Sequence, residues 1–485
     1  MKMRTKVRAV TAALLALAAL TATGPAQAAD PDPGLALSNF ELRPIKNRAT
    51  LQDRVATMNQ EFDNIGVNEI LQNANNTGRF SSGVCNDAAT AGTSTPQNLV
   101  SSFCFDTDDN GNSNSEWIPQ GVTGVGDADA DMTWGDATTG WDPAAHKPLL
   151  VTWYNKDDWN GDKVNDDVDV DGTNTAVKGV RISFIDSGTG KYAHVLLVYP
   201  FTNDSGNASW MGMRTTQKYG AGSLHAGGIV WYGYKLYVAD TNRGFRVFDL
   251  RDIIDLQGNL PEGTSYGTDK TAVGRQSGVF YAHGYRYILP ESDGWTNAGC
   301  DTLEMVPSPV CDMQDGDKTC TRYDVTPRFS SASLDRSASV RHVVTGEWCA
   351  RPNTTEYATG RVVRWPMLDD GGLPKVSSDG LWKGDAAYRI PFDYRLDPSL
   401  NGGIQGVASY NGTYFLNQSL GTTSNGVTQV ARPNSDGRLE TLYTLQGAIG
   451  LEDLTIWPDR ADPMFWTVTE YGGARMMYGI RPTQP

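Results

Sequence analysis

A recurring place in the chain, the start of an apolar run of strand type, holds residues that could do chemistry. The residues at this place are His225, Gln120, Gln276, Gln405, Glu452 and Asp453. Carboxylates beside a histidine suit proton transfer near neutral pH. A glutamine amide both donates and accepts hydrogen bonds, which suits a hydroxyl-rich ligand. If the fold brings them together, we expect catalytic roles for His225, Glu452 and Asp453, with the three glutamines orienting the ligand.

Two acidic stretches could hold a cation. In the first, Asp158, Asn160, Asp162 and Asp166 stand at positions 1, 3, 5 and 9 of a loop. This spacing resembles the calcium loops of EF-hand and dockerin type, where alternating oxygens surround a hard cation. The loop departs from that pattern at position 6, where Lys163 replaces glycine, so a solvated acidic loop remains the alternative.

In the second stretch, Asp106, Asp108 and Asn110 take positions 1, 3 and 5, and Gly111 takes position 6. Trp117 stands where an acidic twelfth residue is expected. Calcium is the cofactor considered at both stretches, with a solvated acidic loop as the alternative at each, and the millimolar calcium met by exported proteins could fill even weak sites.

The first 28 residues predict export. Four basic residues precede or enter an apolar run from Ala9 to Leu20, and Ala26-Gln27-Ala28 forms a small-residue cleavage site. This is the pattern of a Sec-type signal peptide, and the run is shorter than the ~20 residues that a membrane span needs. We therefore expect a secreted, extracellular protein without a membrane span.

Composition narrows the class of protein. The net charge of −15 argues against nucleic acid or anionic membrane as partners, because both are bound through a surplus of lysine and arginine. Six cysteines in an exported chain predict three disulfides. We expect Cys85 to pair with Cys104, and the two bonds among Cys300, Cys311, Cys320 and Cys349 are left open.

The elements that must position these residues are short strands. Residues 225–231, 234–240 and 244–250 alternate with period 2 and are separated by tight turns, which predicts an antiparallel meander. Diverged versions of the meander recur, and we count six. The predicted fold is all-β, a six-bladed propeller over 117–485. A closing strand for the last blade is expected near Leu35–Arg43.

An N-terminal extension over 29–116 precedes the propeller. Within residues 49–76 the apolar positions Leu51, Val55, Met58, Phe62 and Ile65 follow helical spacing. The extension is thus expected to hold a short helix and a loop closed by the predicted Cys85–Cys104 bond.

Residues 238–249, Val-Ala-Asp-Thr-Asn-Arg-Gly-Phe-Arg-Val-Phe-Asp, resemble the blades of NHL-repeat and lactonase-like six-bladed propellers. The whole chain resembles a group of exported actinobacterial propeller proteins of unassigned activity. The resemblance implies the fold and no particular reaction, because propellers host many unrelated functions.

Propeller geometry places the start of each innermost strand and the end of each second strand on one face, beside the channel. The second-strand ends are Asn155, Asp240, Glu291, Glu347, Asn417 and Glu470, and of these we expect Glu347 to bind ligand. The chain lacks the Walker, dinucleotide and His-Glu-x-x-His motifs. The predicted function is hydrolysis or elimination on a carbohydrate or lactone at this face. The alternatives are non-catalytic binding of glycans or proteins, a metal held by His225, His283 and carboxylates, and a channel lining of structural polar groups.

Overall fold

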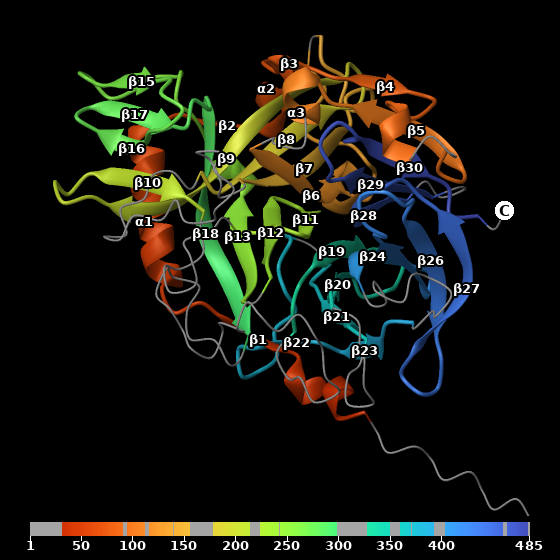
Figure 1. Cartoon of the computed structure of the whole chain (residues 1–485). Helices are drawn as coiled ribbons and strands as arrows, with labels where there is room; N and C mark the ends of the chain where they lie inside the picture. The colour runs from red at the N-terminus through yellow and green to blue at the C-terminus, as the bar shows by residue number, and fades with distance from the viewer. Residues whose placement is uncertain are drawn as a thin grey trace, which may run out of the picture. The chain divides into compact units, whose positions relative to one another are not determined.

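The computed structural model of the 485-residue chain is mostly β-structure (Figure 1). It describes residues 32–90, 95–111, 116–138, 140–155, 178–213, 224–241, 243–297, 327–349, 359–369, 371–391, 403–458 and 463–483. No helix within these ranges is long and apolar enough to cross a membrane.

The described residues form five meanders arranged as propeller blades. Blade 1 is β6 (Trp117–Gly124), β7 (Pro148–Asn155), β8 (Val180–Asp186) and β9 (Lys191–Thr202). Blade 2 is β11 (Ile229–Tyr232), β12 (Lys235–Asp240), β13 (Gly244–Asp249) and β18 (Tyr287–Asn297). Blade 3 is β19 (Ser331–Asp335), β20 (His342–Gly346), β21 (Arg361–Pro366) and β23 (Ala386–Arg389). Blade 4 is β24 (Ile404–Tyr410), β25 (Thr413–Gln418), β26 (Val427–Pro433) and β27 (Leu439–Gln446).

Blade 5 closes the ring with a strand from the N-terminal extension. Its strands are β28 (Leu451–Trp457), β29 (Met464–Thr469), β30 (Met477–Ile480) and β5 (Leu99–Cys104), and β4 (Arg79–Ser81) adds an outer strand. The first strands contact one another in the cyclic order β6, β11, β19, β24, β28 and back to β6. This ring makes the fold a propeller and surrounds its axis with buried strands.

The predicted blade count of six differs from the five blades that the described residues form. Residues 276–289, which the sequence predicts to belong to one blade, lie in two different sheets. β16 (Val273–Gln276) and β17 (Val279–Ala282) join β15 (Ser265–Gly267) in a separate three-stranded sheet. β18 is the outer strand of blade 2 and also pairs in parallel with β9 of blade 1. Alternation identified strands correctly there, but it carries no information about which sheet a strand joins.

The predicted closing strand also differs. Residues Glu41–Pro44 form β1, which pairs with β18 and with β22 (Trp382–Lys383) rather than with blade 5. The strand that pairs with β30 is β5. Both segments are short and precede the first blade, so strand propensity alone could not choose between them.

The extension holds helices as well as strands. Helix α1 (Arg48–Glu61) buries Leu51, Val55 and Met58 and contacts β9 and β18. It is shorter than the predicted range, because β2 (Asn64–Ile65) and α2 (Val67–Gln72) follow. The short helix α3 (Thr107–Asn110) lies between β5 and β6.

The predicted Cys85–Cys104 disulfide is confirmed, with a Cα–Cα separation of 5.4 Å. Cys349 is also disulfide-bonded, whereas Cys300, Cys311 and Cys320 lie outside the described residues.

Glycine permits the first strands to approach one another closely. A Cβ on Gly406 would lie 2.5 Å from the backbone oxygen of Glu452, and one on Gly228 would lie 2.3 Å from the backbone nitrogen of Ala332. Real Cβ atoms do not approach backbone so closely, so glycine at these two positions lets the first strands of neighbouring blades meet.

Candidate active site

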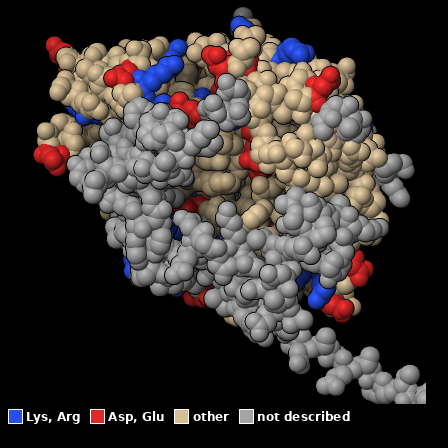
Figure 2. Space-filling view, viewed as in Figure 1, with Lys and Arg blue, Asp and Glu red and all other residues tan. Residues whose placement is uncertain are grey.

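Three β-bulges shape the channel end of the first strands. The pairing register shifts between Pro119 and Val122 in β6, between Ile404 and Gly406 in β24, and between Leu451 and Leu454 in β28. The bulged positions hold Gln120, Gln405, Glu452 and Asp453. A bulge re-aims side chains that regular pleating would send to alternate faces, and here it turns predicted site residues toward a common point. Figure 2 shows a hollow near the middle of one face, with acidic atoms in its walls.

At this point two carboxyl groups meet. Glu452 is 1% exposed and its side chain is hydrogen-bonded to that of Glu470, which follows β29. Gln405 Nε2 donates to Glu452 Oε1 over 3.1 Å. Gln120 Nε2 donates to Glu470 Oε2 over 3.3 Å. The structure thus brings Gln120, Gln405 and Glu452 together through Glu470, a second-strand end to which the sequence analysis assigned no role.

The environment keeps one proton on the carboxyl pair. Burial, followed by the charge of Glu470, raises the pKa of Glu452 well above its usual value. Burial also raises the pKa of Glu470, against hydrogen bonds from Tyr471, Gln120 and Glu452. Two carboxylates in contact cannot both ionise cheaply, so they share a proton. Because the pKa of the buried Glu452 is raised well above its usual value, we assign the shared proton to Glu452 and the accepting oxygen to the partly exposed Glu470.

Asp453 follows Glu452 in β28 and is fully buried. Its Oδ2 accepts from the backbone N–H groups of Val122 and Ile229, each over 3.3 Å, and its Oδ1 accepts from that of Ala332 over 3.2 Å. These donors belong to blades 1, 2 and 3. The side chain predicted to be catalytic therefore ties blades 1, 2 and 3 to blade 5 through buried hydrogen bonds.

His225 lies on the approach to β11 and is exposed. Its ring stacks on that of Tyr154, at the end of β7, with centroids 4.9 Å apart. Tyr154 is near enough to Arg475 to influence the pKa of that guanidinium. His225 thus belongs to the same end of the ring as the carboxyl pair, on the side of blades 1 and 2.

Two predicted ligand-binding residues occupy other settings. Gln276 is exposed at the end of β16 in the separate three-stranded sheet, where its Nε2 donates to Val273 O over 3.1 Å. It is not on the channel, which corrects the prediction. Glu347 follows β20 and is buried against Arg361, with two 2.7 Å contacts from the guanidinium. Burial works against ionisation of Glu347, but Arg361 holds its pKa below the usual value.

The second acidic stretch folds as a helix cap. Asp106 caps α3 by accepting from Asp109 N over 3.0 Å, and Asn110 Oδ1 accepts from Arg475 N over 3.1 Å. Within the described ranges, no group of three or more His, Cys, Asp or Glu residues could hold a metal ion. Asp158, Asn160, Asp162 and Asp166 lie outside those ranges. Calcium binding stays a prediction.

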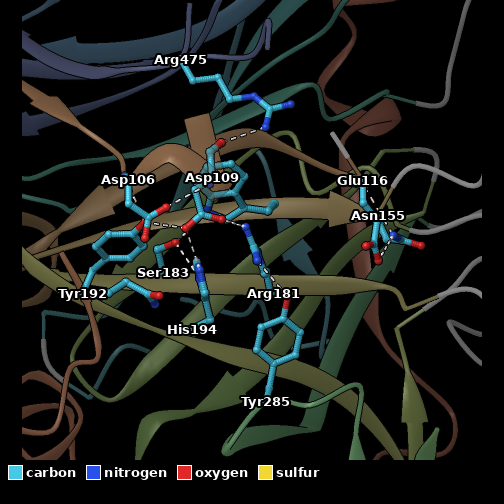
Figure 3. Close-up of polar contacts among 12 residues, drawn as sticks. Asp106, Asp109, Glu116, Asn155, Arg181, Ser183, Tyr192, His194, Tyr285 and Arg475 are labelled. Atoms are coloured by element: carbon cyan, nitrogen blue, oxygen red, sulfur yellow. Dashed lines mark hydrogen bonds and ion pairs between the residues drawn. The ribbon is translucent and has the colours of Figure 1, made fainter. Parts of the chain in front are cut away.

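A buried hydrogen-bonded chain beside α3 has the composition of a catalytic triad (Figure 3). Ser183 Oγ lies 3.0 Å from His194 Nδ1, and His194 Nε2 lies 3.0 Å from Asp109 Oδ2. Ser183 is fully buried and accepts from Trp153 Nε1 over 2.7 Å. Asp109 is also bound by Arg181 and by the Tyr192 hydroxyl. A nucleophile must reach substrate, so this chain is internal scaffolding.

Comparisons with known proteins assign no family. No family model matches the chain, and no curated protein matches it. Among solved structures, the chain is similar to a β-xylosidase (TM-score 0.31, 12% identity, covering 70% of this chain and 89% of that one). It is also similar to a glycoside hydrolase family 43 arabinoxylan arabinofuranohydrolase from Bacillus subtilis (TM-score 0.28, 9% identity, 76% and 64%). A third is the family 32 β-fructofuranosidase of Bombyx mori (TM-score 0.30, 10% identity, 77% and 63%). These scores are too low to carry an activity to this chain.

Proposed function

We propose that the chain is an exported hydrolase of a sugar-derived substrate and that the Glu452–Glu470 pair is its acid and base. The observation that carries the proposal is the hydrogen bond between these side chains, one buried and one partly exposed. A pair that shares one proton offers a carboxylic acid and a carboxylate together near neutral pH. Export is proposed from the leader-like residues 1–28.

The pair can activate water for attack on a carbonyl carbon and then supply the proton for the leaving oxygen. Glu470 would take a proton from the water as its oxygen attacks a carbonyl carbon. As the acyl–oxygen bond breaks, the leaving oxygen would take a proton from the partly exposed Glu470, which would take the proton of the buried Glu452 in turn. The Glu452 carboxylate and the Glu470 acid produced in this way exchange a proton through their hydrogen bond, which restores the starting state. Gln405 and Gln120 hold the two carboxyl groups through the contacts described above.

The spacing of the pair favours a sugar lactone or ester over a glycoside. Glycosidases place their two carboxyl groups about 5–9.5 Å apart, so that a sugar ring or water fits between them. Glu452 and Glu470 are in direct hydrogen-bond contact, which leaves no such gap. A carbonyl substrate needs only one water at the pair, as in other carboxyl pairs that share a proton.

A non-catalytic glycan-binding propeller is the second candidate. Gln120 Oε1 is buried and has no hydrogen-bond partner among the described residues, which makes it an acceptor for a ligand hydroxyl. The stacked rings of Tyr154 and His225 add an aromatic surface at the same end of the ring.

The experiment is a hydrolysis screen of residues 29–485 on sugar lactones, sugar esters and aryl glycosides, with and without chelator. Glu452→Gln and Glu470→Gln should each lower kcat by about 10²–10⁴-fold, as expected for loss of a general acid or base. Glu440→Gln is the matched control, because Glu440 is exposed on β27 and bonded only to Asn434 in the contacts described. Full turnover by both site variants contradicts the proposal. Saturable glycan binding without turnover supports the second candidate.

A further inference from the structure

The propeller ring closes at one seam, between blades 5 and 1. The chain completes blade 5 with β5, passes through α3, and enters blade 1 at β6. Asp109 of α3 faces blade 1, where Arg181 of β8 binds it. His194 and Tyr192 of β9 also bind it, over 3.0 and 2.5 Å (Figure 3). The α3 turn is therefore fixed to blade 1 by a buried carboxylate.

The opposite side of α3 holds the turn that carries Glu470. Gly473 N donates to Asn110 O over 2.9 Å, and Arg475 N donates to Asn110 Oδ1 over 3.1 Å. The Arg475 guanidinium joins both sides of the seam. Its Nη1 donates to Asp109 O over 3.0 Å, and its Nε donates to Glu470 O over 2.9 Å. Arg475 is 2% exposed, so these bonds are shielded from water.

We propose that Asp109, Asn110 and Arg475 form a seam latch whose task is to position Glu470 against Glu452. Arg475 and Asn110 are positioning residues, because they act on the backbone that carries Glu470 and lie behind it. The inference rests on the proposed function for its catalytic consequence. Closure of the ring and assembly of the site then occur together, because α3 both connects blade 5 to blade 1 and holds the turn that carries Glu470.

Charge supports the same arrangement. Burial and the charge of Arg181 lower the pKa of Arg475 to about 10, which leaves it cationic at neutral pH. That charge helps to lower the pKa of Glu470, whose burial otherwise raises it. The latch thus favours Glu470 as the ionised member of the pair.

The disulfide ties the latch to the extension. Asn86, next to Cys85, donates from Nδ2 to Gly473 O over 2.7 Å. The Glu470 turn is thereby held from both ends of the Cys85–Cys104 segment, since Cys104 lies just before α3.

The test compares Arg475→Lys and Asn110→Ala with Arg246→Lys as the control. Arg246 is a buried arginine of blade 2, paired with Asp240 and Glu291 and away from the seam. The first readout is the carboxyl titration of the pair, followed by NMR of ¹³C-labelled glutamate and assigned with Glu452→Gln and Glu470→Gln. The second readout is kcat and KM on any substrate found in the screen.

Loosening the latch should weaken the coupling between the two carboxyl groups. In both latch variants, the two macroscopic pKa values of the pair should then approach each other by about one pH unit. We expect kcat to fall about 10-fold or more with KM within twofold, because small misplacements of a catalytic group are costly. The control should lose thermal stability without moving the titration.

Unchanged titration steps in folded Arg475→Lys and Asn110→Ala overturn the latch. If Arg475→Lys does not fold, Asn110→Ala decides, because Asn110 is partly exposed and loses a single acceptor. If the wild-type protein hydrolyses nothing, the proposed function fails while the titration still decides the latch.

Discussion

Glu347 and Glu470 occupy matching places in two blades and have opposite surroundings. Each follows the second strand of its blade, β20 in blade 3 and β29 in blade 5. Glu347 receives both arms of Arg361 and the backbone N–H of Arg328 over 3.0 Å. Glu470 instead faces the carboxyl group of Glu452. Glu347 and Arg361 thus form a neutralised ion pair, whereas Glu470 and Glu452 form a pair of acidic groups.

The comparison shows that the position of a residue within its blade predicts whether it belongs to the ring of polar residues. The side chain that it contacts then determines its protonation state and therefore the chemistry that it can do. Glu347 has its pKa lowered by Arg361 despite burial, so it stays ionised and inert. Glu470 has its pKa raised by burial and holds one end of a shared proton. Perturbed carboxyl pairs of this kind are typical of functional sites.

The largest expected effect is a difference in stability between the variants Glu347→Gln and Glu452→Gln. Glu347→Gln leaves the guanidinium of Arg361 buried without its counter-charge, which should cost about 3–5 kcal/mol of unfolding free energy. Glu452→Gln replaces a neutral hydrogen-bond donor by another, so its change should stay within about 1 kcal/mol. Urea unfolding at pH 7 measures both. Equal losses would show that Glu452 is an ionised structural residue like Glu347.

The pH dependence of stability should show which carboxyls are held neutral. Burial raises the pKa of Asp127 to about 7, against hydrogen bonds from Thr123 and Thr455. Between the unfolded pKa of 3.8 and about 7, the folded protein keeps a proton that the unfolded chain has lost. Stability should therefore fall as pH rises through this window, by about 1.4 kcal/mol per pH unit from this group.

Asp127→Asn removes one titrating proton and should reduce the slope between pH 4 and 7 by about 1.4 kcal/mol per pH unit, while other buried carboxyls with a raised pKa, such as Glu291, keep their share of it. The contribution of Glu347 to stability depends on pH in the opposite direction. Because its pKa is lowered in the folded protein, this contribution is present above the unfolded pKa and is lost as pH falls. Urea unfolding of the wild type and Asp127→Asn across this range checks the slope. Parallel profiles would mean that Asp127 is ionised in the folded protein.

The smallest effect concerns Gln405. Its amide lowers the pKa of Glu452 against the larger raising effect of burial. Gln405→Leu should raise that pKa further, so the alkaline limb of the kcat profile should move upward. We expect a loss of roughly 3–10-fold in kcat, the worth of one neutral hydrogen bond. An alkaline limb that moves downward would contradict the assignment of Glu452 as the acid.

Local sequence predicted which residues lie at the ends of the first strands where local structure decides their position. Gln120, Gln405 and Glu452 were found because each starts an apolar run, and each lies at a bulge of a first strand. Gln276 has the same local sequence pattern but lies in a separate sheet. Sheet membership depends on long-range pairing, which alternation does not encode.

The shared proton could not be predicted from the sequence. The contact between Glu452 and Glu470 depends on a bulge in β28 and on a turn held by Asn110 of the extension. Neither has a sequence signal of its own. The blade count failed for a similar reason, because β18 serves two blades at once. By contrast, Cys85 and Cys104 are close in sequence, and their bond was predicted.

The protonation of Glu452 at neutral pH is the most direct test of the account. Infrared difference spectra of the wild type minus Glu452→Gln at pH 7 report the carbonyl stretch of a protonated carboxylic acid. The account predicts one such band, which shifts in Glu470→Gln because its hydrogen-bond partner changes from a carboxylate to an amide. The absence of the band at pH 7, with both glutamates ionised, would contradict the shared proton and with it the proposed chemistry.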